Sequence, residues 1–140
     1  MTVSIHYITP ATIALLGNVA PDVFDHAIEP ERVAAYVADP LHAMFVAAED
    51  GKVVGHIRGC VHLQPDRASD LYIDNLGTAP GHQRRGIASD LMRALLAWGE
   101  AQGCTYAWVG TETDNGGAIR FYAAQHFEHS TIAMFALEMD

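Results

Sequence analysis

The chain of 140 residues is poor in basic side chains. Lysine and arginine together number 8 against 17 aspartates and glutamates, which gives a formal net charge of −9. A general nucleic-acid binder needs a basic face to neutralise phosphates, so this composition argues against that class. The acidity suits a cationic substrate or partner better, although a negative net charge also serves solubility.

Cysteine, leader sequences and long apolar runs are also scarce or missing. Cys60 and Cys104 are too few for a disulfide scaffold and are not paired as zinc ligands. The eight histidines form no His-Glu-x-x-His or Cys-His pattern, so we expect no metal. No basic-then-apolar segment opens the chain, and no run of about 18 apolar residues could span a membrane. We therefore expect a cytoplasmic protein.

Half of the residues are hydrophobic, and neither repeats nor a linker divide the chain. This length buries one core, so we expect a single domain over residues 1–140. Hairpin-linked strands followed by two crossover helices predict a mixed α/β fold with helices on both faces of the sheet. The predicted strands are 4–8, 43–49, 53–63, 70–78, 106–111 and one or two within 127–139; the predicted helices are 10–16, 30–38, 86–102 and 115–125.

Residues 76–92 (LGTAPGHQRRGIASDLM) join the end of a predicted strand to the longest predicted helix. The N-terminus of a helix exposes unpaired N–H groups and the positive end of its dipole, which together bind anions. Gly86 lets a phosphate approach the backbone, small Ala88 leaves the next turn unobstructed, and Arg84 and Arg85 add positive charge. This pattern indicates a diphosphate site. The alternative is a plain loop-to-helix junction.

The same segment resembles motif A of the GNAT superfamily of acetyl-CoA-dependent N-acetyltransferases, Gln/Arg-x-x-Gly-x-Gly/Ala, at Gln83, Gly86 and Ala88. Residues 115–127 are similar to the family's Asn-x-x-Ala-x-x-x-Tyr helix, although His126 stands where glycine usually ends it. The resemblance implies a mostly antiparallel twisted sheet of six to seven strands flanked by about four helices, with acetyl-CoA as co-substrate. The residues it implies for the cofactor are Leu76, Gly77, Thr78, Gln83, Arg84, Arg85, Gly86, Ile87, Ala88, Ser89, Asn115 and Tyr122.

Further matches within 22–25, 39–48, 72–76 and 82–88 resemble the small aminoglycoside 3-N-acetyltransferases. This resemblance implies acetylation of a cationic small-molecule amine, an aminoglycoside at its 3-N position, and hence antibiotic resistance. It also implies a homodimer. The alternatives are acetylation of a protein or peptide amine, an amino acid or a polyamine, and a catalytically silent module that binds acyl-CoA.

The resemblance implies two catalytic side chains. Tyr122 stands where the family places the acid that protonates the departing thiolate, and the alternative is a tyrosine of the core. A carboxylate of the strand before motif A often faces the cleft in this family, which makes Asp74 the candidate base or water-positioning group. By period-two alternation Tyr72, Asp74 and Leu76 share a face. The aminoglycoside subgroup has its acid one position later, at Asn75 here.

An acceptor carrying several amines needs several carboxylates to replace its lost hydration. Acidic residues crowd the segment 22–31, where the family binds its acceptor, and the alternative is a solvated acidic surface. Backbone N–H groups near Leu76 and Gly77 are expected to hold the thioester oxygen. The predicted substrate-binding residues are Asp22, Asp25, Glu29, Tyr72, Asp74, Asn75 and Glu112.

Overall fold

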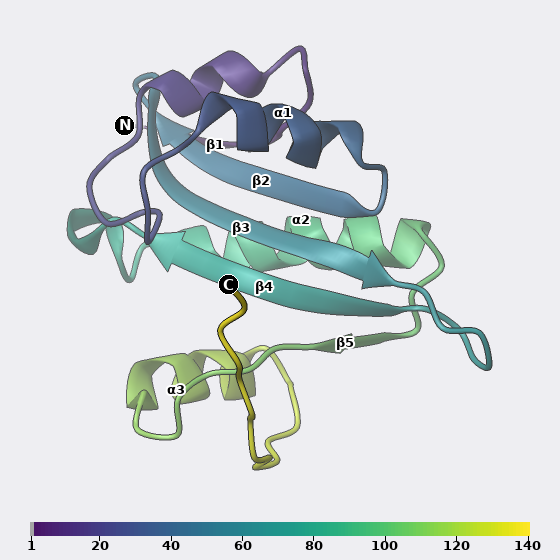
Figure 1. Cartoon of the computed structure of the whole chain (residues 1–140). Coiled ribbons are helices and arrows are strands. Elements are labelled where there is room, and N and C mark those ends of the chain that lie inside the picture. The colour runs from purple at the N-terminus through teal and green to yellow at the C-terminus, as the bar shows by residue number, and fades with distance from the viewer. Residues whose placement is uncertain (1) are drawn as a thin grey trace. The chain divides into compact units, whose positions relative to one another are not determined.

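The computed structural model describes residues 2–140, in two compact units that meet in the chain between Val109 and Gly110 (Figure 1). The first unit contains the sheet and the helices that cover it. In chain order its elements are β1 (Val3–Tyr7), the 3₁₀ helix η1 (Ile13–Gly17), α1 (Pro30–Ala38), β2 (His42–Glu49), β3 (Lys52–His62), β4 (Asp70–Thr78), the 3₁₀ helix η2 (Pro80–His82), α2 (Ile87–Ala101) and β5 (Tyr106–Trp108). The second unit contains α3 (Gly116–Ala124).

The strands form one mixed sheet in the order β1-β2-β3-β4-β5. Neighbours from β1 to β4 are antiparallel, and β5 is parallel to β4. The predicted mixed α/β class is therefore confirmed. Within the described residues there are five strands rather than six or seven, and three α-helices rather than about four. One reason is that the predicted helix over 10–16 is only the short η1, which begins at Ile13.

A tight turn joins β2 to β3, as the Asp-Gly pair predicts. Asp50 and Gly51 both have positive φ, 51° and 77°, which is the backbone of a type I′ hairpin. The turn sets the register in which Glu49 faces Lys52. Glu49 is thereby the last residue of β2, beside the turn.

Helix α2 covers one face of the sheet with the predicted apolar stripe. Ile87, Leu91 and Leu95 are buried. The helix lies close to β3 because glycines face it. A Cβ added to Gly55 would lie 3.1 Å from the Ile87 side chain, and one added to Gly59 would lie 3.1 Å from that of Leu95. Glycines at these two positions of β3 therefore let α2 pack closely on the strand.

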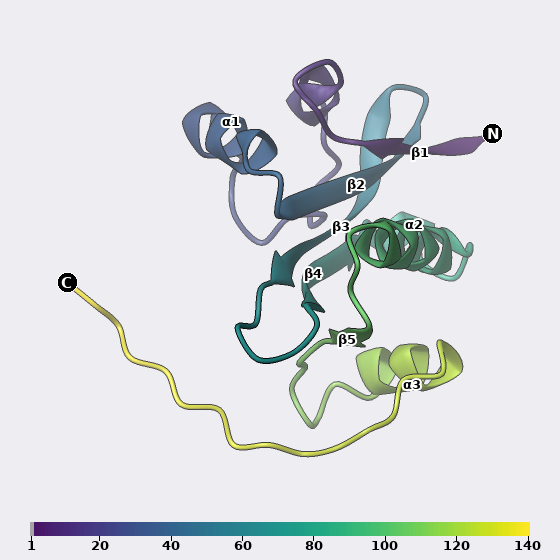
Figure 2. The ribbon, with the colours of Figure 1, turned by 90° about the vertical axis from the view of Figure 1, so that its right-hand side faces the viewer.

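Helix α1 covers the opposite face of the sheet (Figure 2). It begins at Pro30 and ends before Asp39-Pro40, as predicted, because proline suits the first helical position and the residue before a proline disfavours helix. The Tyr36 hydroxyl donates a hydrogen bond to the Ala43 carbonyl at 3.0 Å. The expected placement of helices on both faces is thus confirmed, and no helix of the described residues is long and apolar enough to cross a membrane.

Strand β5 is shorter than the predicted 106–111 and pairs with β4 only over Asp70–Tyr72. The buried carboxylate of Asp70 holds this junction, since it accepts hydrogen bonds from Trp108 Nε1 at 2.9 Å and Gln64 Nε2 at 2.8 Å. After Trp108 the two strands no longer pair. From Ile73 onward the outer edge of β4 therefore has no strand beside it within the described part of the chain.

In the second unit, residues 127–140 contain neither helix nor strand and run as extended chain (the yellow segment in Figure 2). The predicted closing strands within 127–139 are therefore wrong for the chain as it stands here. A strand needs a neighbour to satisfy its backbone N–H and C=O groups. No strand of the described residues pairs with this segment, although its composition favours one.

Candidate functional site

Strand β4 contains a bulge at the predicted catalytic position. Ile73 pairs with Gly59 and Asn75 pairs with Arg58, so Asp74 is the extra residue. A bulge shifts the alternation of side chains by one position. Because Gly59 faces α2, its partner Ile73 also faces α2, whereas Asn75 joins Arg58 on the opposite face, that of α1.

Leu76 consequently lies on the α2 face of the sheet. It pairs with Ile57, which is fully buried and lies midway between Gly55 and Gly59, both in contact with α2. The prediction that Tyr72, Asp74 and Leu76 share a face is wrong for Leu76, since strict alternation cannot foresee a bulge. The role expected of Leu76 rests on its backbone N–H and does not depend on this face.

Asp74 carries an accessible carboxylate held by a cation. Its Oδ2 accepts a hydrogen bond from Arg58 Nε at 3.1 Å, while the Asp74 side chain is 49% exposed. The ion pair orients the carboxylate on the α1 face and leaves it open to solvent. A carboxylate in this setting is able to accept a proton or to hold a water molecule.

The acidic segment before α1 lies against the same part of β4. Asn75 Nδ2 donates to Asp25 Oδ2 at 3.1 Å. A Cβ added to Gly77 would lie 2.3 Å from the Val23 carbonyl oxygen, so only glycine admits this approach. The structure thus brings the predicted residues Asp25, Asn75 and Gly77 together beside Asp74.

Two other predicted acceptor residues of the first unit, Glu29 and Asp22, do not join this group. Glu29 is paired with Arg32 at 2.7 Å, and both side chains are exposed. Asp22 is exposed at a positive φ of 68°, and Glu112 belongs to the second unit. Among the described residues, no cluster of three or more His, Cys, Asp and Glu side chains could hold a metal ion.

His56 lies beneath this region and was not among the predicted site residues. Its ring is fully buried and stacks on Phe24 with a centroid distance of 3.8 Å. Neither ring nitrogen has a well-formed hydrogen bond to a described residue, although the Val23 backbone is close. Burial, reinforced by the charge of Arg58, lowers the pKa of His56 to about 3. The only sequence signal was a histidine within an apolar strand.

The loop between β4 and α2 has the backbone expected of an anion site. Gly86 is the N-cap residue of α2 at a φ of 79°, and as a glycine it has no side chain with which to cap the helix. A Cβ at Gly86 would meet nothing within 4 Å, so glycine is required there by the left-handed backbone rather than by space. The N–H groups of the first turn of α2 follow directly after this glycine, the arrangement by which helix N-termini bind anions.

The two arginines of this loop differ in whether they form an ion pair. Arg85 is bound by Glu49, whose Oε2 lies 2.7 Å from the Arg85 guanidinium. Arg84 is exposed at a φ of 64° and forms no ion pair with any described residue. Glu49 lies 36 positions before Arg85, and nothing in its local sequence indicates the contact.

The remaining predicted cofactor residues of the first unit are contiguous along one strand–loop–helix segment. Leu76, Gly77 and Thr78 end β4, and Gln83 lies in the loop. Ile87, Ala88 and Ser89 form the first turn of α2. The outer edge of β4 over 73–78, which no strand pairs, lies directly before the loop.

In the second unit, Asn115 caps α3, with Oδ1 accepting from the Ala118 N–H at 3.1 Å. Tyr122 is half-buried between the rings of Phe121 and Phe127, and burial raises the pKa of its phenol. His126 adopts a φ of 69°. It therefore keeps the left-handed turn that the family usually assigns to glycine, at a conformational cost of about 1 kcal/mol.

Known proteins are similar to this chain in sequence and in fold. Residues 12–127 match the Acetyltransferase (GNAT) family. An uncharacterised N-acetyltransferase of Mycobacterium tuberculosis is 34% identical over 116 residues, covering 81% of this chain and 70% of that protein.

Two solved structures have the same architecture at low identity. An aminoglycoside acetyltransferase from an uncultured soil metagenomic sample superposes with a TM-score of 0.86, at 22% identity and with 100% of each chain covered. Aminoglycoside acetyltransferase AAC(6′)-Iy, in complex with the bisubstrate analogue CoA-S-monomethyl-acetylneamine, gives 0.82 at 18% identity, again over 100% of each chain. At these identities the likeness shows the fold. Together with the family match, it establishes that the chain belongs to the GNAT family of acetyltransferases.

Proposed function

We propose that this acyltransferase moves an acetyl group from acetyl-CoA to a primary amine of a cationic small molecule, with an aminoglycoside as the best specific candidate. The observation that carries the proposal is the N-terminus of α2 behind the left-handed N-cap residue Gly86, with Arg84 unpaired among the described residues beside it. A diphosphate matches this arrangement of N–H groups and positive charge. The fold shared with a structure that holds a CoA-based bisubstrate analogue supports the same co-substrate.

The cofactor is proposed to follow the strand–loop–helix segment. The diphosphate binds at Gln83–Ser89, and the pantetheine arm runs along the edge of β4 that no described strand pairs. Asn115 stays a predicted contact of the cofactor. Amide donors from Leu76 and Gly77 stabilise the oxyanion that forms on the thioester carbonyl. The unpaired edge of β4 supports this role, because its backbone groups have no strand to bind.

The chemistry requires two proton movements. The amine arrives as an ammonium ion and loses a proton to Asp74, directly or through a water molecule. The neutral nitrogen then attacks the thioester carbonyl, so that a C–N bond forms and the C–S bond breaks. The departing thiolate takes a proton from the Tyr122 phenol. The phenol is protonated at neutral pH, but burial raises its pKa and so weakens it as an acid, which means that the transfer also needs polar stabilisation of the phenolate that forms.

The acceptor is proposed to lie over the α1 face of β4. Asp25, Asn75 and Asp74 gather there, and Tyr72 precedes them on the same face. Two carboxylates on one face of the sheet suit an acceptor with more than one amine. The name of AAC(6′)-Iy specifies the 6′ position, so acetylation at 3-N stays a prediction that product analysis must decide.

The test is coenzyme A release measured with a panel of amines. We expect turnover with aminoglycosides and little with single amino acids, peptide N-termini or simple polyamines, and mass spectrometry of the product identifies the acetylated nitrogen. Turnover with only the other amines would exclude aminoglycosides and assign the acceptor to one of those other classes. Binding of CoA without turnover on any amine would favour the silent acyl-CoA-binding module.

Four wider properties complete the proposal. The two units form one acetyltransferase domain, because the family match runs through their boundary. The enzyme works in the cytoplasm, where acetyl-CoA is supplied, and confers aminoglycoside resistance if the panel selects those substrates. It also forms a homodimer, which the apolar C-terminal segment supports. Its side chains Ile132, Met134, Phe135, Leu137 and Met139 are 75–92% exposed in the single chain.

A further inference from the structure

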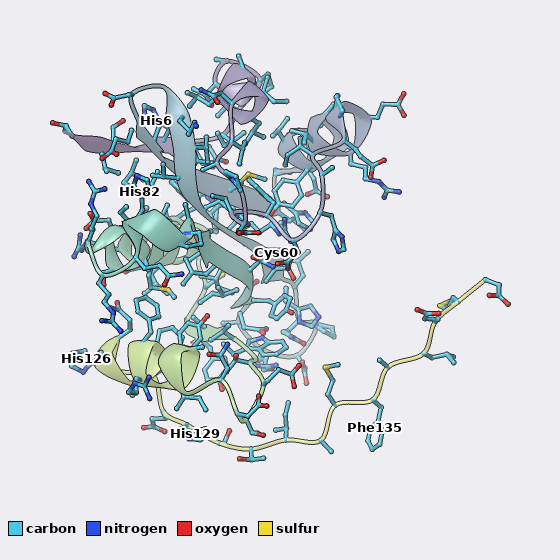
Figure 3. All side chains as sticks on the ribbon, turned by 90° about the vertical axis from the view of Figure 1, so that its left-hand side faces the viewer. His6, Cys60, His82, His126, His129 and Phe135 are labelled. Atoms are coloured by element: carbon cyan, nitrogen blue, oxygen red, sulfur yellow. The ribbon has the colours of Figure 1, made fainter. Side chains whose placement is uncertain are left out.

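Glu49 ties the end of β2 to the loop that is proposed to hold the diphosphate. Its side chain is only 10% exposed. Oε1 accepts from His82 Nε2 at 3.0 Å, and Oε2 accepts from Arg85 at 2.7 Å. His82 ends η2 beside α2 (Figure 3), so both donors belong to the β4–α2 loop. One carboxylate thus fixes two points of the loop, three residues apart, to the sheet.

The loop needs such a restraint because its backbone is strained. Arg84 and Gly86, on either side of Arg85, both have left-handed φ values, 64° and 79°. The left-handed region costs a residue other than glycine about 1 kcal/mol, so Arg84 keeps this φ only where its surroundings enforce it. The Arg85 side chain, anchored on Glu49, is the restraint between the two positions.

We propose that Glu49 is a positioning residue for the diphosphate of acetyl-CoA, acting through Arg85 and His82 to hold residues 82–86 in the conformation that presents the N–H groups of α2. The inference rests on the proposed function and deepens it. Arg85 is charge-compensated by Glu49 and therefore acts mainly on the shape of the loop. The unpaired Arg84 supplies most of the attraction for the anion.

The test is the substitution Glu49→Gln, which keeps the size of the side chain and removes its charge. We expect the Kd for CoA, measured by calorimetry, to rise about tenfold, the usual scale for a partly buried, charge-assisted contact. The kcat at saturating acetyl-CoA is expected to change less than threefold. With S-acetylpantetheine, which lacks the diphosphate, kcat/KM should be the same for the variant and the wild type. A substitution that merely damaged the structure would lower kcat/KM with S-acetylpantetheine as well as the affinity for CoA.

Two further variants control the result. Glu100→Gln removes the same charge from the exposed far end of α2, about 20 Å along the helix, and should leave the Kd unchanged. The variant Arg85→Gln tests whether Glu49 acts through Arg85. If Glu49 acts through Arg85, the double variant binds CoA about as weakly as the weaker single variant.

The outcomes separate this inference from the proposed function. Failure of the wild-type protein to bind CoA would overturn both. Wild-type affinity in Glu49→Gln would overturn the inference alone, as would equal losses with CoA and S-acetylpantetheine. Fully additive effects of the two substitutions would also overturn it, because Glu49 and Arg85 would then act independently.

Discussion

Tyr122 is the proposed proton donor to the departing thiolate. Its half-buried ring lies between Phe121 and Phe127, and burial raises the pKa of the phenol. The phenol is protonated at physiological pH, as that of an exposed tyrosine also is, and the upward shift makes it the weaker acid of the two. The coenzyme A thiolate that leaves the acetyl carbon takes this proton as the C–S bond breaks.

The substitution Tyr122→Phe removes only this hydroxyl. We expect kcat to fall by about 10²-fold or more, the range for loss of a general acid, with the Kd for CoA little changed. Steady-state turnover and calorimetry measure the two quantities. Tyr106→Phe is the matched control, because Tyr106 is 62% exposed on β5 and has no proposed role. Equal turnover of Tyr122→Phe and the wild type would remove the acid role.

His56 makes stability depend on pH. Its folded-state pKa of about 3 lies below the ordinary value of 6.5, so the unfolded chain binds the proton first. The histidine therefore costs no stability above pH 6.5, and stability is lost progressively as pH falls from 6.5 toward 3. The loss approaches about 1.4 kcal/mol per pH unit within that window.

His56→Leu should flatten this dependence. The free energy of unfolding, measured with urea at pH 7.5, 6 and 5, should fall less steeply toward acid in the variant than in the wild type. The comparison of slopes cancels the contribution of the carboxylates, which both proteins share. Parallel pH profiles would show that His56 takes up its proton in the folded state as readily as in the unfolded chain.

Some residues of the candidate site could be found from the sequence and others could not. Gln83, Gly86 and Ala88 follow from a local pattern, because an anion loop is made by consecutive residues. Glu49 could not be found, since its partners lie more than thirty positions away. The role of His56 depends on Phe24 covering it, which is equally non-local.

At the scale of elements, the bulge in β4 explains how the site is displayed. Ile73 faces α2, while Asp74 and Asn75 both lie toward the α1 face. Regular alternation would place one of these two polar side chains in the core. The bulge was invisible in the sequence, whereas α1, α2 and α3 were predicted almost to the residue because proline, a periodic apolar stripe and asparagine mark their limits.

Close packing of β3 against β4 and α2 depends on Gly59. A Cβ there would lie 2.7 Å from the Tyr72 carbonyl oxygen and 3.1 Å from the Leu95 side chain. Because the nearer atom belongs to the backbone, Gly59→Ala must separate the strands, at a cost of about 1–3 kcal/mol. Gly17→Ala is the control, since nothing lies within 4 Å of that position. Urea unfolding should show a large loss for Gly59→Ala only; equal stabilities would contradict the packing argument.

At the scale of the whole molecule, the C-terminal segment is where prediction and structure differ most. Its apolar residues favour a strand, yet residues 127–140 form none in the single chain. A strand is defined by its partner, and no sequence pattern of one chain says whether that partner lies in the same molecule. Phe135, which projects from the extended segment in Figure 3, is 92% exposed.

In the proposed homodimer, the second copy of the chain buries the apolar side chains of this segment. Burying a large apolar side chain contributes about 1.5–3 kcal/mol, and a two-fold dimer buries each contact twice. We therefore expect light scattering to report twice the 15.2 kDa chain mass. The double substitution Phe135→Asp and Leu137→Asp, which places charge on one face of the segment, should give a monomer. Thr131→Asp adds charge at its start and should leave the dimer intact. A monomeric wild type would remove the homodimer proposal, and a dimer that survives the double substitution would assign the interface to another surface.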